Sequence, residues 1–206
     1  MRAYIFAGGV IDPANIYCKP GAEDLTIAAD SGWHNALALG ITPQILLGDF
    51  DSIGADSLPE AKEILQVPAE KDRTDTQLAV DLALSRGAHE MVIVGGLGGR
   101  LDHALSNLGV LEMLSERHVH AILEDGFNRV RFLRNTGALI ARSAYQYLSV
   151  LAADKTVKGV SVDGCKYPLK GAKLSRACGW TVSNEITGNC ALVEVRRGGI
   201  FVLETK

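Results

Sequence analysis

The sequence predicts an α/β fold: a doubly wound, mostly parallel sheet with helices on both faces, followed by an all-β sandwich. In residues 1–135, short apolar runs alternate with segments of helical periodicity, which is typical of a parallel sheet covered on both sides. From residue 136 onward this alternation stops, and short β-rich segments follow one another between turn dipeptides such as Asp163-Gly164 and Gly198-Gly199. We therefore expect an α/β domain over residues 1–135 and a β-sandwich over residues 136–206.

The individual elements follow from the same patterns. Near-continuous apolar runs predict buried strands over Ala3–Ala7, Leu25–Ala29, Gln44–Leu47, Ile64–Val67, Glu90–Val94 and Val119–Leu123. Between several of them, segments of helical periodicity predict helices over Ser31–Leu39, Thr74–Arg86 and Asp102–Arg117. In the second domain, short β-rich runs predict strands over Ala138–Ala141, Gln146–Leu151, Val157–Val162, Ala191–Val195 and Ile200–Leu203.

The composition is that of an ordinary globular protein, with 47% hydrophobic and 22% charged residues in a chain of 206. The N-terminal apolar run ends at Gly8-Gly9 and is too short for the core of a signal peptide, and no run is long enough to span a bilayer. We therefore expect a cytoplasmic protein without a membrane partner. The four cysteines, none in a C-x-x-C pair, are expected to be reduced thiols rather than zinc ligands: Cys18, Cys165, Cys178 and Cys190.

Charge is distributed unevenly between the two predicted domains. Residues 1–135 contain 11 Lys+Arg and 19 Asp+Glu, a net charge of −8, whereas residues 136–206 contain 10 and 5, a net charge of +5. An acidic first domain argues against a nucleic-acid partner, because such partners require basic surfaces. It also indicates that some of the carboxylates hold a cation.

Two aspartate-containing segments directly follow predicted strands. The segment Gly48-Asp49-Phe50-Asp51-Ser52 lies beyond the strand that ends at Leu47, where ligands gather in open α/β sheets. Carboxylates are the ligands with which Mg²⁺ is usually bound beside substrate phosphates. The segment Ala29-Asp30-Ser31-Gly32 precedes a helix, whose free N–H groups can bind phosphate. Both segments also have a purely structural explanation, because Asp and Ser form turns and cap helices.

A third segment, Lys71-Asp72-Arg73-Thr74-Asp75-Thr76-Gln77, has the spacing of a capping box. Thr74 and Gln77 would cap the helix, and Asp75 would lie in its first turn, where the helix dipole favours a negative charge. The same segment offers Asp75 as a metal ligand, with Lys71 and Arg73 available to phosphate oxygens. The two roles are compatible.

The glycine-rich segment Gly95-Gly96-Leu97-Gly98-Gly99 follows a strand and leads into Arg100-Leu101-Asp102-His103 and a helix. Glycines at this density are costly in conformational entropy, and such a loop can surround anionic oxygens with backbone N–H groups. It is not the dinucleotide-binding fingerprint, because the third glycine would fall at Leu101, and it lacks the Gly-Lys-Ser/Thr of a Walker A loop. His103 is as readily explained by packing as by catalysis.

Together these segments closely resemble the thiamine pyrophosphokinase (thiamine diphosphokinase) family. The resemblance rests on the four segments above, with the last one extended to Asn107, and on Lys166-Tyr167-Pro168-Leu169, Ser183-Asn184-Glu185 and the strands around Gly198-Gly199 in the β-rich half. It implies transfer of a pyrophosphoryl group from ATP to the hydroxyl of thiamine, with release of AMP. It also implies a homodimer, a catalytic α/β domain and a β-sandwich that helps to bind thiamine.

The resemblance also implies roles for individual residues. Asp30, Asp49, Asp51 and Asp75 match the acidic residues that hold Mg²⁺ and the phosphates, and the nucleotide-binding set comprises Asp30, Ser31, Gly32, Lys71, Thr74, Gly98, Gly99, Arg100 and Asp102. Catalysis is expected from Asp49, Asp51, Asp75 and Arg100, and thiamine binding from Tyr167, Ser183, Asn184 and Trp180. The chain departs from the family at Cys165 and across Arg176–Trp180, which makes Trp180 a second candidate for stacking on the vitamin.

Three other functions remain open at this stage. A pyrophosphokinase acting on another small alcohol, such as a pterin, would use the same metal chemistry. A nicotinamide-dependent oxidoreductase is suggested only by the glycine-rich turn, and a noncatalytic nucleotide sensor would bind ATP without producing AMP. The number of magnesium ions and the general base are not determined by the sequence.

Overall fold

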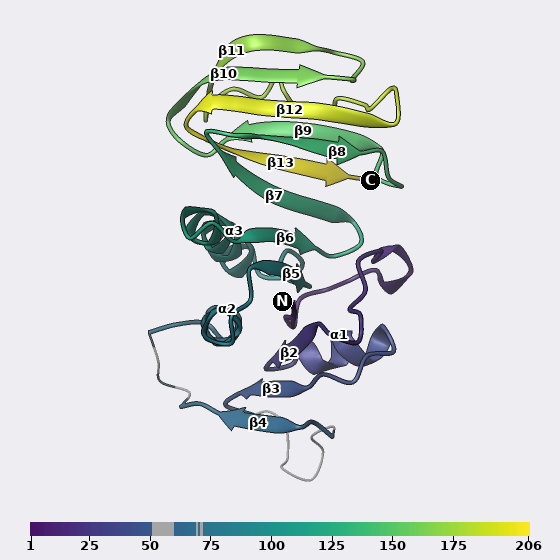
Figure 1. The fold of residues 1–206 in the computed structure, drawn as a ribbon, viewed down its shortest axis with the longest axis vertical. Helices are drawn as coiled ribbons and strands as arrows, with labels where there is room; N and C mark the ends of the chain where they lie inside the picture. The colour runs from purple at the N-terminus through teal and green to yellow at the C-terminus, as the bar shows by residue number, and fades with distance from the viewer. Residues whose placement is uncertain (51–59, 69, 71) are drawn as a thin grey trace. The chain divides into compact units, whose positions relative to one another are not determined.

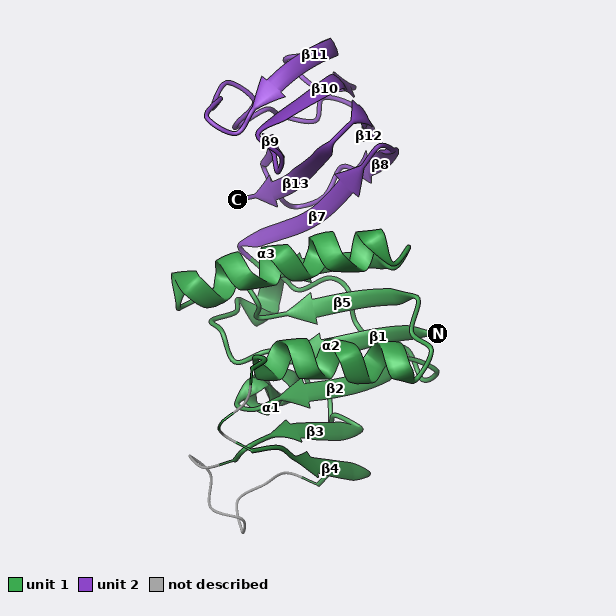
Figure 2. Ribbon diagram, turned by 90° about the vertical axis from the view of Figure 1, so that its left-hand side faces the viewer, with its two compact units in different colours: residues 1–126 green, residues 127–206 purple. Residues whose placement is uncertain are grey.

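The computed structural model describes residues 1–50, 60–68, 70 and 72–206, which form two compact units. Unit 1 comprises Met1–Gly126 and unit 2 comprises Phe127–Lys206 (Figure 2). In the described part of the chain, no helix is long and apolar enough to cross a membrane.

The sheet of unit 1 is parallel, and its strand order is β4-β3-β2-β1-β5-β6. Its strands are β1 (Arg2–Phe6), β2 (Leu25–Ala29), β3 (Ile45–Gly48), β4 (Glu63–Gln66), β5 (Glu90–Val94) and β6 (His120–Glu124). From β1 the chain builds outward through β2 and β3 to β4, and it then returns to place β5 on the other side of β1. The carboxyl ends of β1 and β5 therefore flank a topological switch point, where ligands bind in folds of this kind.

In the described part of unit 1, three helices cover the two faces of this sheet: α1 (Gly32–Ala38), α2 (Asp75–Ser85) and α3 (Leu101–Glu116), with the 3₁₀ turn η1 (Pro13–Asn15) after β1. Helix α1 lies on one face, and α2 and α3 lie on the other (Figures 1 and 2). Because both faces are covered, a strand such as β2 is buried at every position, which explains its continuous apolar sequence. The predicted doubly wound sheet is confirmed.

Helix α2 begins as predicted. The Thr74 hydroxyl accepts a hydrogen bond from the Gln77 N–H, and the Gln77 side-chain oxygen accepts one from the Thr74 N–H, both at 3.2 Å. This capping box fixes the start of the helix at Asp75, whose carboxylate then lies in the first turn.

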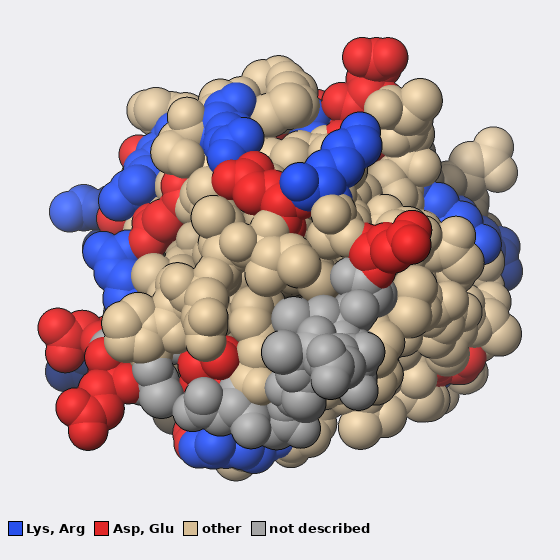
Figure 3. All heavy atoms as spheres, turned by 90° about the horizontal axis from the view of Figure 1, so that it is seen from below, with Lys and Arg blue, Asp and Glu red and all other residues tan. Residues whose placement is uncertain are grey.

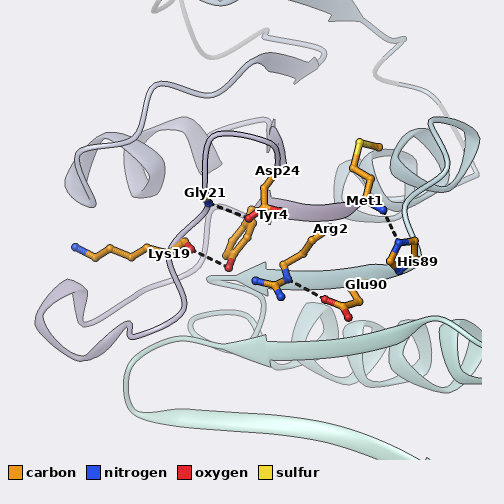
Figure 4. Close-up of polar contacts among 8 residues, drawn as sticks. All are labelled: Met1, Arg2, Tyr4, Lys19, Gly21, Asp24, His89 and Glu90. Carbon is orange, nitrogen blue, oxygen red and sulfur yellow. Dashed lines mark hydrogen bonds and ion pairs between the residues drawn. The ribbon is translucent and has the colours of Figure 1, made fainter.

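Polar contacts tie together the N-terminal ends of β1 and β5, at the edge of the sheet away from the switch point (Figure 4). Arg2 Nε donates to Glu90 Oε2 at 2.9 Å, which holds the pKa of Glu90 below its usual value, and the N-terminal ammonium contacts His89. The Tyr4 hydroxyl donates to the Lys19 carbonyl at 3.0 Å. The Arg2–Glu90 pair is largely exposed, so its contribution to stability is small.

Unit 2 is a sandwich of two antiparallel layers, β7-β13-β9 and β11-β10-β12-β8. Its strands are β7 (Asn128–Arg134), β8 (Gly137–Ala141), β9 (Tyr147–Ala152), β10 (Thr156–Asp163), β11 (Leu169–Ser175), β12 (Cys190–Arg197) and β13 (Gly199–Thr205). Inward-facing residues from both layers, such as Val150, Val193 and Ile200, form one core. The predicted β-sandwich is confirmed.

Two strands of unit 2, β7 and β11, were not predicted, because polar residues interrupt the apolar pattern of their sequences. β7 contains three arginines, yet Arg129 and Arg131 both form ion pairs with the buried Glu204 on β13, at 3.7 and 2.6 Å. β11 is an edge strand that contains two lysines and a glycine. Because β7 pairs with β13 along its whole length, it belongs to unit 2, and the units divide after Gly126 rather than after residue 135.

Candidate functional site

Unit 1 contains a cavity of about 370 Å³ at the switch point. Five segments line it, each at a strand end or the start of a helix. They are Ala7–Val10 after β1, Ala29–Ser31 after β2, Thr74–Thr76 at the start of α2, Gly95, Gly96 and Gly98–Arg100 after β5, and His103 and Asn107 on α3. The cavity therefore brings together much of the predicted nucleotide-binding set, namely Asp30, Ser31, Thr74, Gly98, Gly99 and Arg100, with the predicted metal ligand Asp75.

The two glycine-containing loops in this cavity pack directly against each other. A Cβ atom on Gly9 would lie 2.5 Å from the Gly98 carbonyl oxygen and closer still to that of Gly95. A Cβ atom on Gly98 would lie 2.5 Å from the Val10 carbonyl oxygen. Larger residues would force the loops apart, so glycine is required for the close approach of backbone to backbone.

Asn35 on α1 holds the first of these loops in place. Its side-chain amide donates to the carbonyl oxygens of Ala7 and Gly9, both at 2.7 Å. Asn107 on α3 does the same for the second loop, since its amide donates to the Gly96 carbonyl at 2.8 Å. The cavity wall is thus a pre-organised backbone surface rather than a loose loop.

Asp30 contributes a carboxylate to this cavity. Its backbone has a positive φ of 47°, and its N–H donates to the Leu47 carbonyl at 2.7 Å. Its Oδ1 atom is buried and has no hydrogen-bond donor among the residues described. A buried carboxylate oxygen without a partner is costly, and a bound cation would remove that cost.

Asp75 lines the same cavity, whereas the other two predicted acidic ligands are placed differently. Asp49 follows Gly48, the last residue of β3, whose added Cβ atom would lie 3.1 Å from the Asp30 Cα, but Asp49 does not line the cavity. Asp51 lies outside the described residues. The described residues contain no group of three or more His, Cys, Asp or Glu side chains that could hold a metal ion.

This arrangement fits a cation that arrives with a phosphate ligand. Mg²⁺ is commonly held by one or two carboxylates together with substrate phosphates and water, rather than by a cage of protein ligands. Asp30 and Asp75 supply two carboxylates to a cavity whose other lining residues are mostly glycine and other small residues. The remaining coordination positions would be left to phosphate oxygens and water.

Arg100 and Asp102, both predicted to contact the nucleotide, form an ion pair with each other. Arg100 Nη2 lies 2.6 Å from Asp102 Oδ2, and Nε lies 3.1 Å from Oδ1. The guanidinium beside it lowers the pKa of Asp102 from 3.8 to about 2, and the carboxylate raises the pKa of Arg100. Both side chains are highly exposed, so the pair opens at little cost and the guanidinium is available to a phosphate. Lys71 lies outside the described residues.

Unit 2 contains a second, smaller cavity of about 130 Å³ between β9, β10 and the segments on either side of β11. It is lined by Leu148, Val150, Val162, Tyr167, Pro168, Leu169, Trp180, Thr181, Val182 and Asn184. Tyr167 and Trp180 are 61% and 60% exposed, which is unusual for such large rings and leaves aromatic surface that a ligand could cover. The Lys166 ammonium lies 5.6 Å from the centre of the Tyr167 ring. Of the predicted thiamine-binding residues, Tyr167, Trp180 and Asn184 line this cavity and Ser183 does not.

Ser183 instead shapes the backbone beside the cavity. It has a positive φ of 60°, and its N–H donates to the Ser149 hydroxyl at 3.0 Å. Ser183 lies between Thr181 and Asn184, whose backbones both form hydrogen bonds with β9. The side chain of Ser183 is exposed.

Sequence reasoning missed the loop Gly8–Val10 and its anchor Asn35. The available signal was the Gly8-Gly9 pair directly after a buried strand, which has the same form as the glycine-rich segment that follows β5. Asn35 gave no such signal, because an asparagine on a helix is explained equally well by solvent exposure.

Comparison with known protein families shows which family this chain belongs to. Residues 21–123 match the model described as "Thiamin pyrophosphokinase, catalytic domain", and residues 138–200 match "Thiamin pyrophosphokinase, vitamin B1 binding domain". The chain belongs to the thiamine pyrophosphokinase family. The two matched regions contain the β2, β5 and α2 walls of the first cavity and all of the residues that line the second.

Individual members of the family are similar along most of their length. The chain is 28% identical to thiamine pyrophosphokinase of Bacillus subtilis (strain 168) over 186 residues, which cover 88% of this chain and 87% of that protein. It is 25% identical to thiamin pyrophosphokinase 1 of Caenorhabditis elegans over 171 residues, or 79% and 70% of the two chains.

Solved structures of the family have the same fold. The crystal structure of the Bacillus subtilis enzyme superposes with a TM-score of 0.88 at 27% identity, covering 100% of this chain and 99% of that one. The structure of thiamin pyrophosphokinase from Candida albicans has a TM-score of 0.77 and covers 100% and 89% of the two chains. At 15% identity, this second similarity shows the fold alone.

Proposed function

We propose that this protein transfers the terminal pyrophosphoryl group of ATP to the hydroxyl of thiamine, producing thiamine diphosphate and AMP. Family membership supports the reaction, and the two cavities support a division of labour between the units. The observation that carries the proposal is the cavity in unit 1, where two interlocked glycine loops adjoin the buried, unsatisfied Oδ1 of Asp30.

The unit 1 cavity suits a triphosphate for physical reasons. Backbone N–H groups at a switch point and at the start of α2 favour anionic oxygens, and Arg100 adds a guanidinium. When bound, Mg²⁺ would neutralise charge on the phosphates. Asp30 and Asp75 would hold that ion, and we retain Asp49 and Asp51 as further members of the acidic set. Arg100 would stabilise charge on the phosphates as the thiamine hydroxyl attacks the β-phosphorus and AMP departs.

The unit 2 cavity suits the vitamin. Thiamine carries a cationic thiazolium ring, and aromatic faces attract such a cation by about 0.5–2 kcal/mol. Tyr167 and Trp180 supply two exposed rings beside an aliphatic floor that includes Leu148 and Val150. The apolar lining would favour planar rings over a strongly hydrated ligand.

The experiment that tests this function is an AMP-release assay with purified protein, with and without thiamine and with and without Mg²⁺. We expect AMP only when both are present, together with a product that has the mass of thiamine diphosphate. Release of AMP with a pterin alcohol but not with thiamine would replace this proposal with the alternative pyrophosphokinase. Tight ATP binding without AMP in any mixture would indicate a nucleotide sensor.

The oligomeric state and location belong to the same proposal. We propose a cytoplasmic homodimer, as the family resemblance implies. Sedimentation equilibrium would give twice the mass of the 206-residue chain if the dimer forms. A single-chain mass across the concentration range of the assay would contradict it.

A further inference from the structure

The segment 180–187 forms hydrogen bonds both with β9 and with the residues between β10 and β11. On one side it pairs with β9: the backbones of Asn184 and Leu148 exchange two hydrogen bonds of 2.7 and 3.0 Å, and the Val150 N–H donates to the Thr181 carbonyl at 3.0 Å. On the other side, the Lys166 N–H donates to the Glu185 carbonyl at 2.9 Å. The segment therefore connects β9 to the residues just before β11.

At the centre of this connection, the side chain of Asn184 holds the backbone of Tyr167. Asn184 Oδ1 accepts from the Tyr167 N–H at 3.0 Å, and Asn184 Nδ2 donates to the Tyr167 carbonyl at 2.7 Å. The same Oδ1 also accepts from the Glu185 N–H at 3.0 Å. Asn184 is buried, with 9% of its surface exposed, whereas the Tyr167 ring that it holds is mostly exposed.

The hydrogen-bonding capacity of an amide limits what Asn184 can offer a ligand. A side-chain amide oxygen accepts two hydrogen bonds and its nitrogen donates two. The two bonds to Oδ1 use the whole accepting capacity, and the bond to the Tyr167 carbonyl uses one of the two donors. At most one N–H remains, so Asn184 cannot accept a hydrogen bond from a bound molecule without releasing Tyr167 or Glu185.

We propose that Asn184 is a positioning residue that acts on the vitamin through Tyr167. Its amide fixes the backbone that carries the ring, and the ring then forms one wall of the cavity. This inference rests on the proposed function, because it treats the cavity as the thiamine site. It differs from the role implied by resemblance, in which Asn184 itself would bind thiamine.

A double-mutant cycle distinguishes the two roles. Thiamine dissociation constants would be measured by calorimetry for wild type, Asn184→Ala, Tyr167→Ala and the double variant. If Asn184 acts through Tyr167, Asn184→Ala weakens thiamine binding about tenfold when the Tyr167 ring is present. In the Tyr167→Ala background the same substitution has almost no further effect. If Asn184 contacts thiamine directly, its loss costs the same factor in both backgrounds, and the proposal is overturned.

A second variant and a matched control guard against a general loss of structure. Asn184→Asp keeps both accepted hydrogen bonds but places an oxygen against the Tyr167 carbonyl, so it should show the same coupling to Tyr167→Ala. Thr187→Val removes a different bond of the same segment, from the Thr187 hydroxyl to the Gly164 carbonyl at 3.2 Å. Its thiamine affinity should equal that of wild type, and an equal loss there would contradict a specific role for Asn184.

Hydrogen exchange of the Tyr167 amide gives a readout that requires no ligand. Asn184→Ala should accelerate exchange at this amide, and Thr187→Val should leave it unchanged. Unchanged exchange in Asn184→Ala would overturn the positioning claim even if the protein binds thiamine. Failure of the wild-type protein to bind thiamine would instead overturn the proposed function, while the exchange result still reports on Asn184.

Discussion

In unit 1 the cavity is lined mostly by glycine and other small residues together with two carboxylates, whereas in unit 2 it is lined mostly by aromatic and aliphatic residues. The net charges differ as well. Unit 1 contains 8 Lys+Arg and 19 Asp+Glu, which gives −11, and unit 2 contains 13 and 5, which gives +8. On the face of unit 1 nearest β4, charges of both signs are interspersed (Figure 3).

These charges are the opposite of what the proposed ligands would require from simple attraction. An acidic unit that binds a triphosphate needs a cation to offset the electrostatic repulsion, and the carboxylates at the cavity would hold that cation. A basic unit that receives a cationic vitamin cannot rely on net charge, so binding must come from stacking and burial. If the proposed function holds, local chemistry, and not the net charge of the unit, determines what each cavity binds.

The largest expected effect concerns Asp30. Asp30→Asn should lower turnover by about a hundredfold or more, because the buried oxygen no longer carries the charge that holds the cation. Without Mg²⁺ the variant should melt at a higher temperature than wild type, since an unpaired buried charge is removed. Steady-state kinetics and thermal melts provide the two measurements. Wild-type turnover in the variant would break the assignment of unit 1 to the metal–nucleotide complex.

A somewhat smaller effect is expected at the glycine loops. Gly9→Ala places a methyl group against two backbone carbonyls, so it should lower the free energy of unfolding by about 1–3 kcal/mol and weaken nucleotide binding. The matched control is Gly109→Ala on α3, where an added Cβ meets nothing within 4 Å and should stabilise by about 0.5–1 kcal/mol. Denaturant melts and nucleotide titrations compare the two. Equal nucleotide affinity in both variants would argue that the interlocked loops do not form the phosphate site.

The ring of Tyr167 should matter less than the metal ligands. Tyr167→Ala should weaken thiamine binding about 2- to 30-fold, the equivalent of the cation–π attraction that is lost, and leave nucleotide binding unchanged. Tyr167→Phe keeps the ring and should behave like wild type. A loss of similar size in the phenylalanine variant would show that the hydroxyl, rather than stacking, contributes the affinity.

The Arg100–Asp102 pair should show the smallest effect. Because the folded pKa of Asp102 is about 2, below the ordinary 3.8, its contribution to stability is fully present above about pH 4 and is lost as pH falls through about 2. Nucleotide affinity should therefore not titrate with Asp102 between about pH 5 and pH 9. Comparison of acid melts of wild type and Asp102→Asn tests the sign, and a stability difference that grows toward low pH would contradict it.

The sequence was sufficient to predict the parts of the molecule that depend on local patterns. Buried parallel strands have continuous apolar sequences, and the capping box at Thr74 predicted the start of α2 directly. The position of Asp30 at the end of β2 then followed from the topology of a parallel sheet, and that of Asp75 in the first turn of α2 followed from the capping box.

The rest depends on contacts between residues far apart in the chain. In β7, Arg129 and Arg131 pair with the buried Glu204 of β13, and the hydrogen bonds between Asn184 and Tyr167 join segments on either side of β11. Neither arrangement produces a periodic pattern of residues in the sequence. For the same reason, the resemblance pointed to Asn184 as a thiamine-binding residue but not to its hydrogen bonds with Tyr167.

The most direct test of the central claim is a pair of calorimetric titrations on Asp30→Asn and Tyr167→Ala, each with thiamine and with a nonhydrolysable Mg·ATP analogue. If each cavity holds one ligand, Asp30→Asn loses affinity for the nucleotide and keeps thiamine, and Tyr167→Ala does the reverse. Reduced affinity for both ligands in both correctly folded variants, or a swapped pattern, would contradict the division of binding between unit 1 and unit 2.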